Sequence, residues 1–183
     1  MLRLLVIFTL LSILISYSFN GNSSLFHLSR CFKTSFVQIV TFEGEKEIYS
    51  GILISKEAQK KLIYLTKPPF EIFFDGTYLK MGYKGEGFQT FKADEYPNPI
   101  LGILLHLNDL IKVFKLETCS PNFCVLKPKS PLSDYLKRVK VFFRKGVIKK
   151  IVADGEDYGV VKIFILKWKD CSKSAKVSHS DDG

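Results

Sequence analysis

The 183-residue sequence is short of the residues that build most catalytic and metal sites. It contains three His, two Met and one Trp. His27, His106 and His179 lie far apart along the chain, and no His or second Cys pair stands near the one closely spaced Cys pair. A metal site needs several ligands at suitable spacing, and an enzyme needs a nucleophile or base with an orienting partner. The sequence therefore predicts no enzyme, no cofactor and no metal site.

The sequence also lacks internal repeats and any linker that would divide it. Hydrophobic residues make up 46% and aromatic residues 14%, with Phe contributing 16 residues. Such a composition is unlike that of disordered chains, and the length is sufficient for one domain with a hydrophobic core. We therefore expect a single folded domain.

Acidic residues are outnumbered, since 18 Asp and Glu stand against 27 Lys and Arg, for a formal charge of +9. A basic balance is compatible with nucleic acid, an anionic membrane surface or an acidic partner. The lysines are scattered, which favours solvated faces over one dedicated basic site. The nearest approach to interleaved aromatic and basic residues is "YLKRVKVFFRKG" (residues 135–146), so a basic polyanion-binding protein stays an alternative.

The first eighteen residues, "MLRLLVIFTLLSILISYS", resemble a secretory signal. Arg3 precedes an apolar run from Leu4 to Ile15, followed by the small residues Ser16 and Ser18. A run of about a dozen apolar residues suits a signal-peptide core and is short for a membrane-spanning helix. We expect residues 1–18 to be a signal peptide cleaved near Ser18; an uncleaved anchor is the alternative.

Export makes the four cysteines candidates for disulfides. Cys119 and Cys124 flank a turn in "CSPNFC", which favours a local disulfide over a metal site. The remaining pair is Cys31 and Cys171, whose bridge would tie the two ends of the domain together. Four cysteines allow three connectivities, so this pairing is an inference from the local turn.

The pattern after the signal predicts a short helix in "NSSLFHLSRCFK" (residues 22–33) and then many strands. From residue 34 the apolar period is two, and short polar or Gly-containing turns such as Asp75-Gly76 and Asp154-Gly155 separate the runs. Connections this short fit antiparallel pairing. The expected strands are residues 35–42, 47–55, 60–66, 70–74, 77–83, 88–93, 114–119, 123–127, 134–146, 147–155 and 159–169.

One longer helix interrupts the strands. Asn98 as N-cap and Pro99 at the first helical position predict a helix start, and we expect the helix to run to Phe114. It is apolar on more than one side, which is typical of a helix that is deeply buried or faces a second apolar surface.

Several strands are apolar on both faces. Ile48, Ile52 and Ile54 fall on one face of residues 47–55, while Tyr49 and Leu53 fall on the other. Such strands suit a sheet covered on both sides or a curved sheet around an apolar cavity. The predicted class is α+β: an unclosed antiparallel β-barrel, or strongly curved sheet, with helices as a lid over an apolar cavity.

The order of these features resembles the LolA family of periplasmic lipoprotein carriers. The resemblance covers residues 23–168 and lies in "TSFVQIV", "YSGILIS", "LIYLTKPPFEIFFDGTYLKMGY", the Pro-led apolar helix, "VLKPKS" and the last hairpin, "VKVFFRKGVIKKIVADGEDYGVVKIFIL". It implies residues 19–170 as a carrier domain and 171–183 as a polar tail. Proteins of this family carry acylated lipoproteins from an inner-membrane release complex to an outer-membrane receptor, where one exists.

The resemblance further implies a monomer in the periplasm that binds acyl chains and no nucleic acid. The family often has an Arg-Pro pair after the second strand that sets open and closed states; here the turn is Ser55-Lys56-Glu57-Ala58, so Lys56 is the lid-gating candidate. A generic secreted lipid-binding or envelope-stress-sensing module on the same fold is the alternative. The candidate cavity-lining residues are Phe36, Ile52, Ile54, Leu62, Ile72, Phe74, Leu101, Leu104 and Leu105.

Overall fold

A computed structural model describes residues 31–96, 98–155 and 159–171 of the chain. These residues form one 11-stranded antiparallel sheet in the order β6-β5-β4-β3-β2-β1-β11-β10-β9-β8-β7. The sheet is not closed, as predicted, because β6 and β7 remain at its two edges. The strands are β1 (Cys31–Phe42), β2 (Glu45–Lys56), β3 (Gln59–Tyr64), β4 (Phe70–Phe74), β5 (Tyr78–Tyr83), β6 (Gln89–Lys92), β7 (Phe114–Ser120), β8 (Phe123–Pro128), β9 (Leu136–Arg144), β10 (Val147–Gly155) and β11 (Val160–Asp170).

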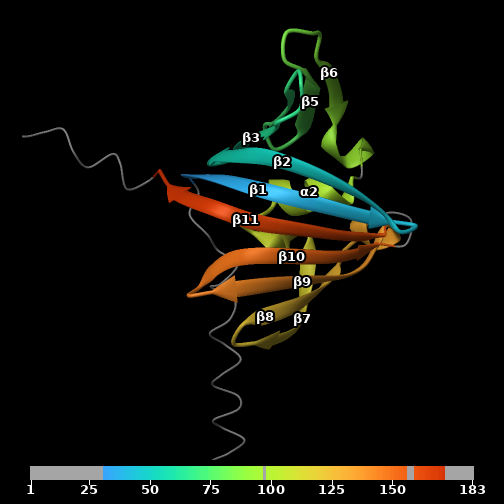
Figure 1. Cartoon of the computed structure of the whole chain (residues 1–183), viewed down its shortest axis with the longest axis vertical. Coiled ribbons are helices and arrows are strands. Elements are labelled where there is room, and N and C mark those ends of the chain that lie inside the picture. The colour runs from blue at the N-terminus through green and yellow to red at the C-terminus, as the bar shows by residue number, and fades with distance from the viewer. Residues whose placement is uncertain (1–30, 97, 156–158, 172–183) are drawn as a thin grey trace, which may run out of the picture.

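The first strand lies in the middle of the sheet (Figure 1). On one side of β1 the chain runs outward as a meander from β2 to β6, and on the other side β11 to β7 form a second meander. We call these the β2–β6 wing and the β7–β11 wing. The pairing of β1 with β11, from Phe32↔Asp170 to Thr41↔Val160, joins the two wings.

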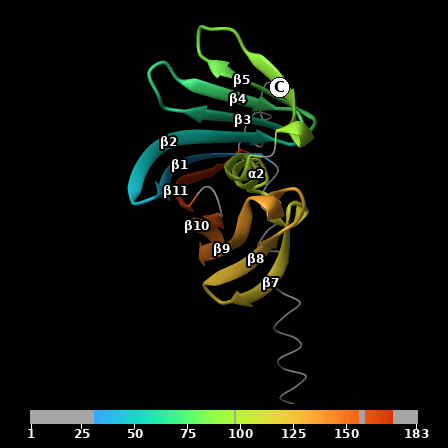
Figure 2. The same ribbon diagram turned by 90° about the vertical axis from the view of Figure 1, so that its right-hand side faces the viewer.

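The sheet curls around one α-helix, α2 (Pro99–Leu105), which Figure 2 shows end-on between the two wings. Three short 3-10 helices accompany it: η2 (Ala93–Glu95), η3 (Leu110–Lys112) and η4 (Leu132–Asp134). The helix therefore lies on the inner, concave face of the sheet, and the opposite face is the outer, convex one.

Tight turns set the strand register. Glu43 (φ 50°) and Gly44 (φ 86°) both have positive φ, as do Lys145 (φ 53°) and Gly146 (φ 72°). Two consecutive residues with positive φ give a turn whose twist matches that of antiparallel strands. At Asp75 the carboxylate Oδ1 accepts hydrogen bonds from the backbone N–H groups of Thr77 and Tyr78, at 2.8 and 2.7 Å. The Asp75 carboxylate therefore stabilises the turn between β4 and β5.

The start of α2 is as predicted, but its length is not. The Asn98 side chain accepts hydrogen bonds from the N–H groups of Ile100 and Leu101, both at 3.0 Å, and Pro99 occupies the first turn. The helix ends at Leu105 rather than at Phe114, which is the first residue of β7. Asp109 leaves the helical region (φ −153°, ψ 65°), since short polar residues compete with helical backbone hydrogen bonds.

The expected N-terminal helix is wrong at its C-terminal end, because residues 31–33 belong to β1 and are paired with β2. Its remaining residues, the signal peptide and the polar tail beyond residue 171 lie outside the described residues. No helix among the described residues is both long and apolar enough to cross a membrane.

Both cysteine pairs form disulfides. Cys119 and Cys124 face each other across β7 and β8, and Cys31 is bonded to Cys171 over a sequence separation of 140 residues. The backbone N–H of Cys171 also donates to the carbonyl of Cys31, at 3.1 Å. The second disulfide therefore fastens β1 to the C-terminal end of β11.

Candidate functional site

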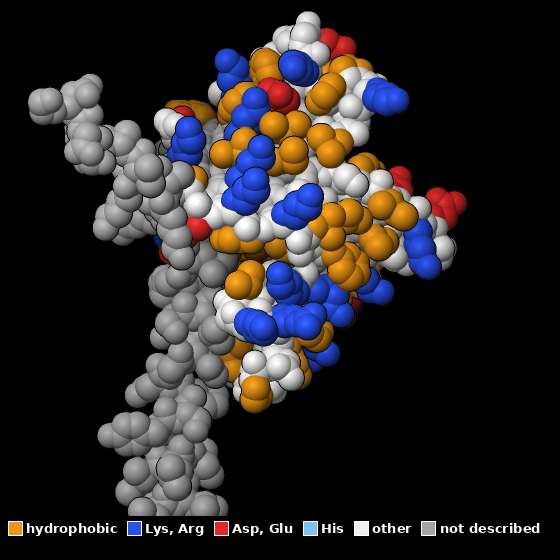
Figure 3. Space-filling view, turned by 60° about the vertical axis from the view of Figure 1, so that its left-hand side comes forward, with side chains coloured by type: hydrophobic (Ala, Val, Ile, Leu, Met, Phe, Trp, Pro, Cys, Tyr) orange, Lys and Arg blue, Asp and Glu red, His pale blue; other side chains and the backbone are white. Residues whose placement is uncertain are grey.

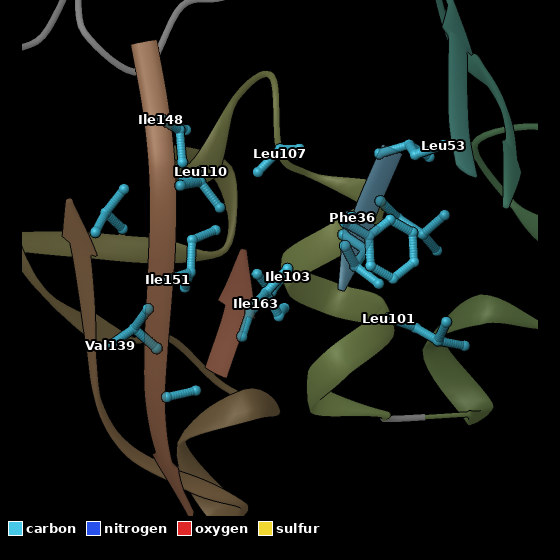
Figure 4. Packing of buried hydrophobic residues seen from close by; sticks show 14 of the residues in the cluster. Phe36, Leu53, Leu101, Ile103, Leu107, Leu110, Val139, Ile148, Ile151 and Ile163 are labelled. Atoms are coloured by element: carbon cyan, nitrogen blue, oxygen red, sulfur yellow. The ribbon is translucent and has the colours of Figure 1, made fainter. Parts of the chain in front are cut away.

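The β7–β11 wing is filled by side chains. The inner-facing side chains of Val139, Ile148, Ile151 and Ile163 are fully buried. Figure 4 shows them facing the residues of α2 and the segment that follows it, whose buried members are Leu101, Ile103, Leu104, Leu105, Leu107 and Leu110. Burial of these leucines is worth about 1.5–3 kcal/mol each relative to exposure. Here α2 is part of the core.

A glycine lets an aromatic ring lie across the sheet beside α2. Phe36 on β1 is paired with Gly51 on β2, and a Cβ at position 51 would overlap the Phe36 ring and approach the backbone of Ile63. The ring of Phe36 meets that of Tyr64 edge-on, with centroids 5.9 Å apart. The Phe36 ring therefore lies at the boundary between the β7–β11 wing and the β2–β6 wing.

The β2–β6 wing keeps an apolar cavity of about 420 Å³, which we call the mouth cavity. It opens between the inner face of β1 to β5 and the first turn of α2. A volume of this size lies in the range of protein sites for small apolar ligands. Its lining residues are Gln38, Val40, Glu47, Tyr49, Tyr64, Thr66, Phe70, Ile72, Met81, Tyr83, Tyr96, Asn98, Ile100 and Leu101.

Polar groups in the mouth cavity are paired with one another. The Tyr64 hydroxyl donates to Gln38 Oε1 at 3.1 Å, and burial raises the pKa of Tyr64. The Tyr49 hydroxyl donates to Glu47 Oε2 at 2.8 Å, and this hydrogen bond, with a smaller effect of burial, raises the pKa of Tyr49. Both phenols are therefore neutral at physiological pH, and the cavity presents aromatic faces to a ligand.

A second cavity of about 360 Å³ lies on the other side of α2. His106, at the C-terminal cap of α2, lines it together with Phe74, and their ring centroids are 6.3 Å apart. Burial, then the positive charges of Lys112 and Lys60, lower the pKa of His106, while Asp109 opposes them. Its other lining residues are Gly76, Thr77, Leu79, Lys92, Ala93, Asp94, Tyr96, Asn98, Leu101, Gly102, Leu105, Val113, Pro131 and Leu132.

The structure separates the predicted cavity residues into groups. Ile72 and Leu101 line the mouth cavity, and Phe74, Leu101 and Leu105 line the second one. The remaining inner-facing candidates are packed in the core, fully or almost fully buried: Phe36, Leu62 and Leu104.

Ile52 and Ile54 were predicted on the wrong face of β2. The register pairs Ile52 with Ser35 and Ile54 with Lys33, on the outer face, whereas Leu53 is fully buried on the inner face. Both faces of this strand carry branched aliphatic residues, so alternation alone could not tell which face turns inward. Leu53 is the core residue at this level.

Lys56, the gating candidate, is an exposed residue at the end of β2. The buried cation nearby is Lys60, whose side chain donates to the carbonyl of Glu57 at 2.9 Å. Burial, followed by the positive charge of Lys112, lowers the pKa of Lys60. Lys60 therefore couples electrostatically, through Lys112, to the segment that follows α2.

Sequence reasoning missed the aromatic and polar rim of the mouth cavity. Tyr49, Tyr64 and Tyr83 sit in strands, where aromatic residues have an ordinary propensity, and nothing in their spacing marked them. The available signal was their position in the inward–outward alternation of the strands. All three share a face with Phe36 or Ile72 through the strand register. To use this signal, the inner face of β2 would first have had to be identified correctly.

Among the described parts of the chain, no group of three or more His, Cys, Asp or Glu is placed to hold a metal ion. The arrangement can bind an apolar molecule against aromatic and aliphatic side chains.

Sequence comparisons give no relative: no protein-family model and no curated protein matches the chain. Among solved structures, a LolA superfamily protein from Nitrosomonas europaea aligns with a TM-score of 0.54 at 7% identity, covering 80% of this chain and 89% of that one.

Two further solved structures align less closely. A protein domain from Vibrio parahaemolyticus, named for outer-membrane lipoprotein sorting, has a TM-score of 0.45 at 11% identity, covering 77% and 85% of the two chains. A DUF1329 family protein from Desulfovibrio piger has a TM-score of 0.48 at 8% identity, covering 85% and 90%.

At such low identity the Nitrosomonas likeness concerns the fold and carries no residue roles. The likeness extends over 80% of this chain, whose sheet curls around α2 without closing. The chain has a LolA-like fold.

Proposed function

We propose that this protein is a periplasmic carrier that binds the acyl chains of lipoproteins in the mouth cavity. It is a binding protein, not an enzyme. It takes its cargo from an inner-membrane lipoprotein-releasing complex, carries it as a monomer, and delivers it to the outer membrane, through a receptor where one exists. The supporting fold likeness is to a LolA superfamily protein.

The observation that carries the proposal is the apolar cavity beside the first turn of an apolar helix. Each CH₂ group transferred from water to such a cavity contributes about 0.8 kcal/mol. The mouth cavity of about 420 Å³ offers uncharged side chains at almost every lining position. It therefore suits a hydrocarbon chain better than a polar metabolite.

The helix α2 is the lid in this proposal. It is short, and its C-terminal end contacts the sheet through His106 and Phe74 rather than through a strand ladder. A Cβ added at Gly102 would come within 2.9 Å of the Leu132 side chain, so α2 lies close against η4. Cargo larger than the mouth cavity would displace the leucines of α2, and the free energy of their burial would favour release when a partner accepts the cargo.

Export accords with the two disulfides, which form in oxidising compartments. In this proposal residues 1–18 are the cleaved signal, 19–170 the carrier domain and 171–183 a polar tail. A secreted lipid-binding or envelope-stress-sensing module would use the same cavity with a different cargo. Mass spectrometry of lipid and acylated protein recovered with the periplasmic protein distinguishes these roles.

The cavity itself is tested by filling it. Val40 lines the mouth cavity, and Val40→Trp should reduce uptake of a fluorescent fatty acid by tenfold or more, because the indole takes the space of the acyl chain. Ile52→Trp is the matched control, since Ile52 lies on the outer face of the neighbouring strand. Fluorescence titration of both variants measures the effect.

Equal loss of uptake in the two variants would count against the mouth cavity as the acyl site. Absence of fatty-acid uptake by the unsubstituted protein, together with no acylated protein recovered from the periplasm, would remove the carrier proposal altogether.

A further inference from the structure

The outer face of the sheet carries apolar and basic side chains in an ordered array. Across β9, β10, β11, β1 and β2, the strand register aligns two adjacent rows of outward-facing residues. We call these rows the outer band. Its members are Phe142, Lys150, Phe164, Val37 and Ser50 in one row, and Lys140, Val152, Lys162, Ile39 and Ile48 in the next.

The apolar members of the outer band are accessible to solvent. Ile48 is 67% exposed, and the side chains of Val37, Ile39, Phe142 and Phe164 are half-buried. Figure 3 shows hydrophobic side chains intermixed with Lys and Arg over much of the face it presents. Exposed apolar groups gathered in one place mark an interaction surface more often than scattered ones do.

The charge of the outer band is of one sign. Lys140 and Lys162 are exposed, and Lys150 Nζ lies 4.2 Å from the centroid of the Phe142 ring. Glu47, next to Ile48 in the sequence, lines the mouth cavity instead. The acidic Asp154 belongs to the adjoining row, at the register position opposite Arg138, whose ion pair is with Glu117. Across the band an anionic surface therefore meets lysines, apolar groups and the uncharged Ser50.

The kind of side chain indicates the kind of anionic partner. The charges of the band are lysines, and lysine is depleted in protein–protein interfaces, where arginine is enriched. Single-stranded nucleic acid needs open aromatic faces for stacking, but Lys150 covers the Phe142 ring. Lysines beside branched aliphatic groups suit a lipid surface, because their stems lie on apolar groups while the ammonium reaches phosphate.

We propose that the outer band docks the protein on the surface of an anionic phospholipid bilayer. The lysines contact headgroup phosphates, and Ile48 and its apolar neighbours enter the interfacial region. The mouth cavity and α2 lie on the opposite face of the same sheet. A docked molecule therefore keeps its mouth turned away from the bilayer and open to a membrane-bound partner or to cargo.

Vesicle flotation tests this proposal with the exported protein recovered from the soluble periplasmic fraction. Vesicles of phosphatidylethanolamine and phosphatidylglycerol (about 70:30) are compared with neutral phosphatidylcholine vesicles. Each lysine near an anionic membrane contributes about fivefold in affinity, so K140Q/K150Q/K162Q should lose on the order of a hundredfold. Binding should also weaken when salt is raised well above about 0.15 M.

The matched control removes the same charge elsewhere. K67Q/K84Q/K145Q changes three exposed lysines outside the strands that make up the band. It should lose less than about tenfold. Ile48→Ser should weaken binding severalfold without changing the denaturation midpoint, since Ile48 is mostly exposed. Fatty-acid uptake should be unchanged in all of these variants, so failure here and failure of the carrier proposal are separate results.

Three results would overturn the proposal. One is no preference of the unsubstituted protein for anionic over neutral vesicles. Another is an equal loss in the two triple variants, which would assign binding to net charge. The third is band-dependent binding to heparin without binding to vesicles, which would make the band a polyanion site.

Discussion

The two wings of the sheet differ in the kind and the burial of the side chains on their inner faces. In the β7–β11 wing most inward side chains are aliphatic and buried, as at Val139 and Ile151. In the β2–β6 wing buried aliphatic residues such as Leu53 lie beside inward aromatic side chains that are only partly covered, at Tyr64, Phe70 and Tyr83. Aliphatic groups interdigitate with α2, whereas tyrosines hold their hydroxyls in contact with polar groups or water and keep space between the rings. One wing supplies stability and the other supplies volume.

The largest expected effect comes from removing the Cys31–Cys171 disulfide, which fastens β1 to β11 at the junction of the two wings. In the chain-entropy account, a cross-link spanning 140 residues stabilises by about 5 kcal/mol, and one spanning 5 residues by about 2 kcal/mol. The double variant C31S/C171S should therefore lower the free energy of unfolding more than C119S/C124S does. Urea denaturation measures both, and a larger loss from the short-loop variant would contradict the comparison.

A cavity in the filled wing should come next. Leu104 is fully buried in α2, and Leu104→Ala should cost about 2–5 kcal/mol of stability. The substitution also weakens the packing of α2, which is the lid in the carrier proposal. We therefore expect fatty-acid affinity to rise. Leu126→Ala removes an equally buried leucine that lies on β8 instead of α2, and should lower stability without that gain. Lower affinity in L104A would show that α2 is part of the binding surface and not a competitor for it.

Truncating the rim of the open wing should affect binding more than stability. Tyr83 lines the mouth cavity and is 43% exposed, so Tyr83→Ala should cost less than about 1 kcal/mol in stability. Loss of its ring should weaken fatty-acid uptake severalfold. Thermal denaturation and fluorescence titration separate the two quantities, and a stability loss as large as that of L104A would mean that the two wings do not differ as described.

The smallest expected effect concerns pH. The pKa of His106 is lowered from its ordinary value of 6.5, so the folded protein binds fewer protons at this site than the unfolded chain. Stability from this group is therefore fully present above about pH 6.5 and is lost as the pH falls through the lower folded-state pKa. His106→Gln should reduce the difference in denaturation midpoint between pH 8 and pH 5. An unchanged difference would exclude His106 as a source of acid sensitivity.

The sequence was sufficient to locate the strands and insufficient for the site. Alternation and short turns such as Asp75-Gly76 located the strands, and Asn98-Pro99 located the start of α2, because both signals are local. The end of α2 at Leu105, with His106 as its C-cap, was concealed by an apolar pattern that continues to Leu107. The inner face of β2 depended on its pairing with Phe36 across Gly51, which is information about a neighbouring strand.

The cavity residues show the same division. Ile72 and Leu101 could be identified as apolar on a half-covered face, but the choice between core packing and an open lining rests on what fills the opposite side. That depends on how far α2 reaches, and hence on its length. The buried Lys60 was concealed because a lysine at a strand start ordinarily points into water.

The position of β1 at the centre of the sheet has a consequence for how the chain folds. Every pairing within the two wings joins strands that are consecutive in the sequence, so each wing can form from local hairpins. Only the ladder that matches Phe36 with Ile165 requires residues from opposite ends of the chain. Contacts between residues so far apart in the sequence form slowly, because the entropy cost of closing the loop comes before the contacts can stabilise the chain. A molecule emerging N-terminus first must therefore hold β1 with one edge unpaired until β11 arrives, and that interval is when this protein most needs protection from aggregation.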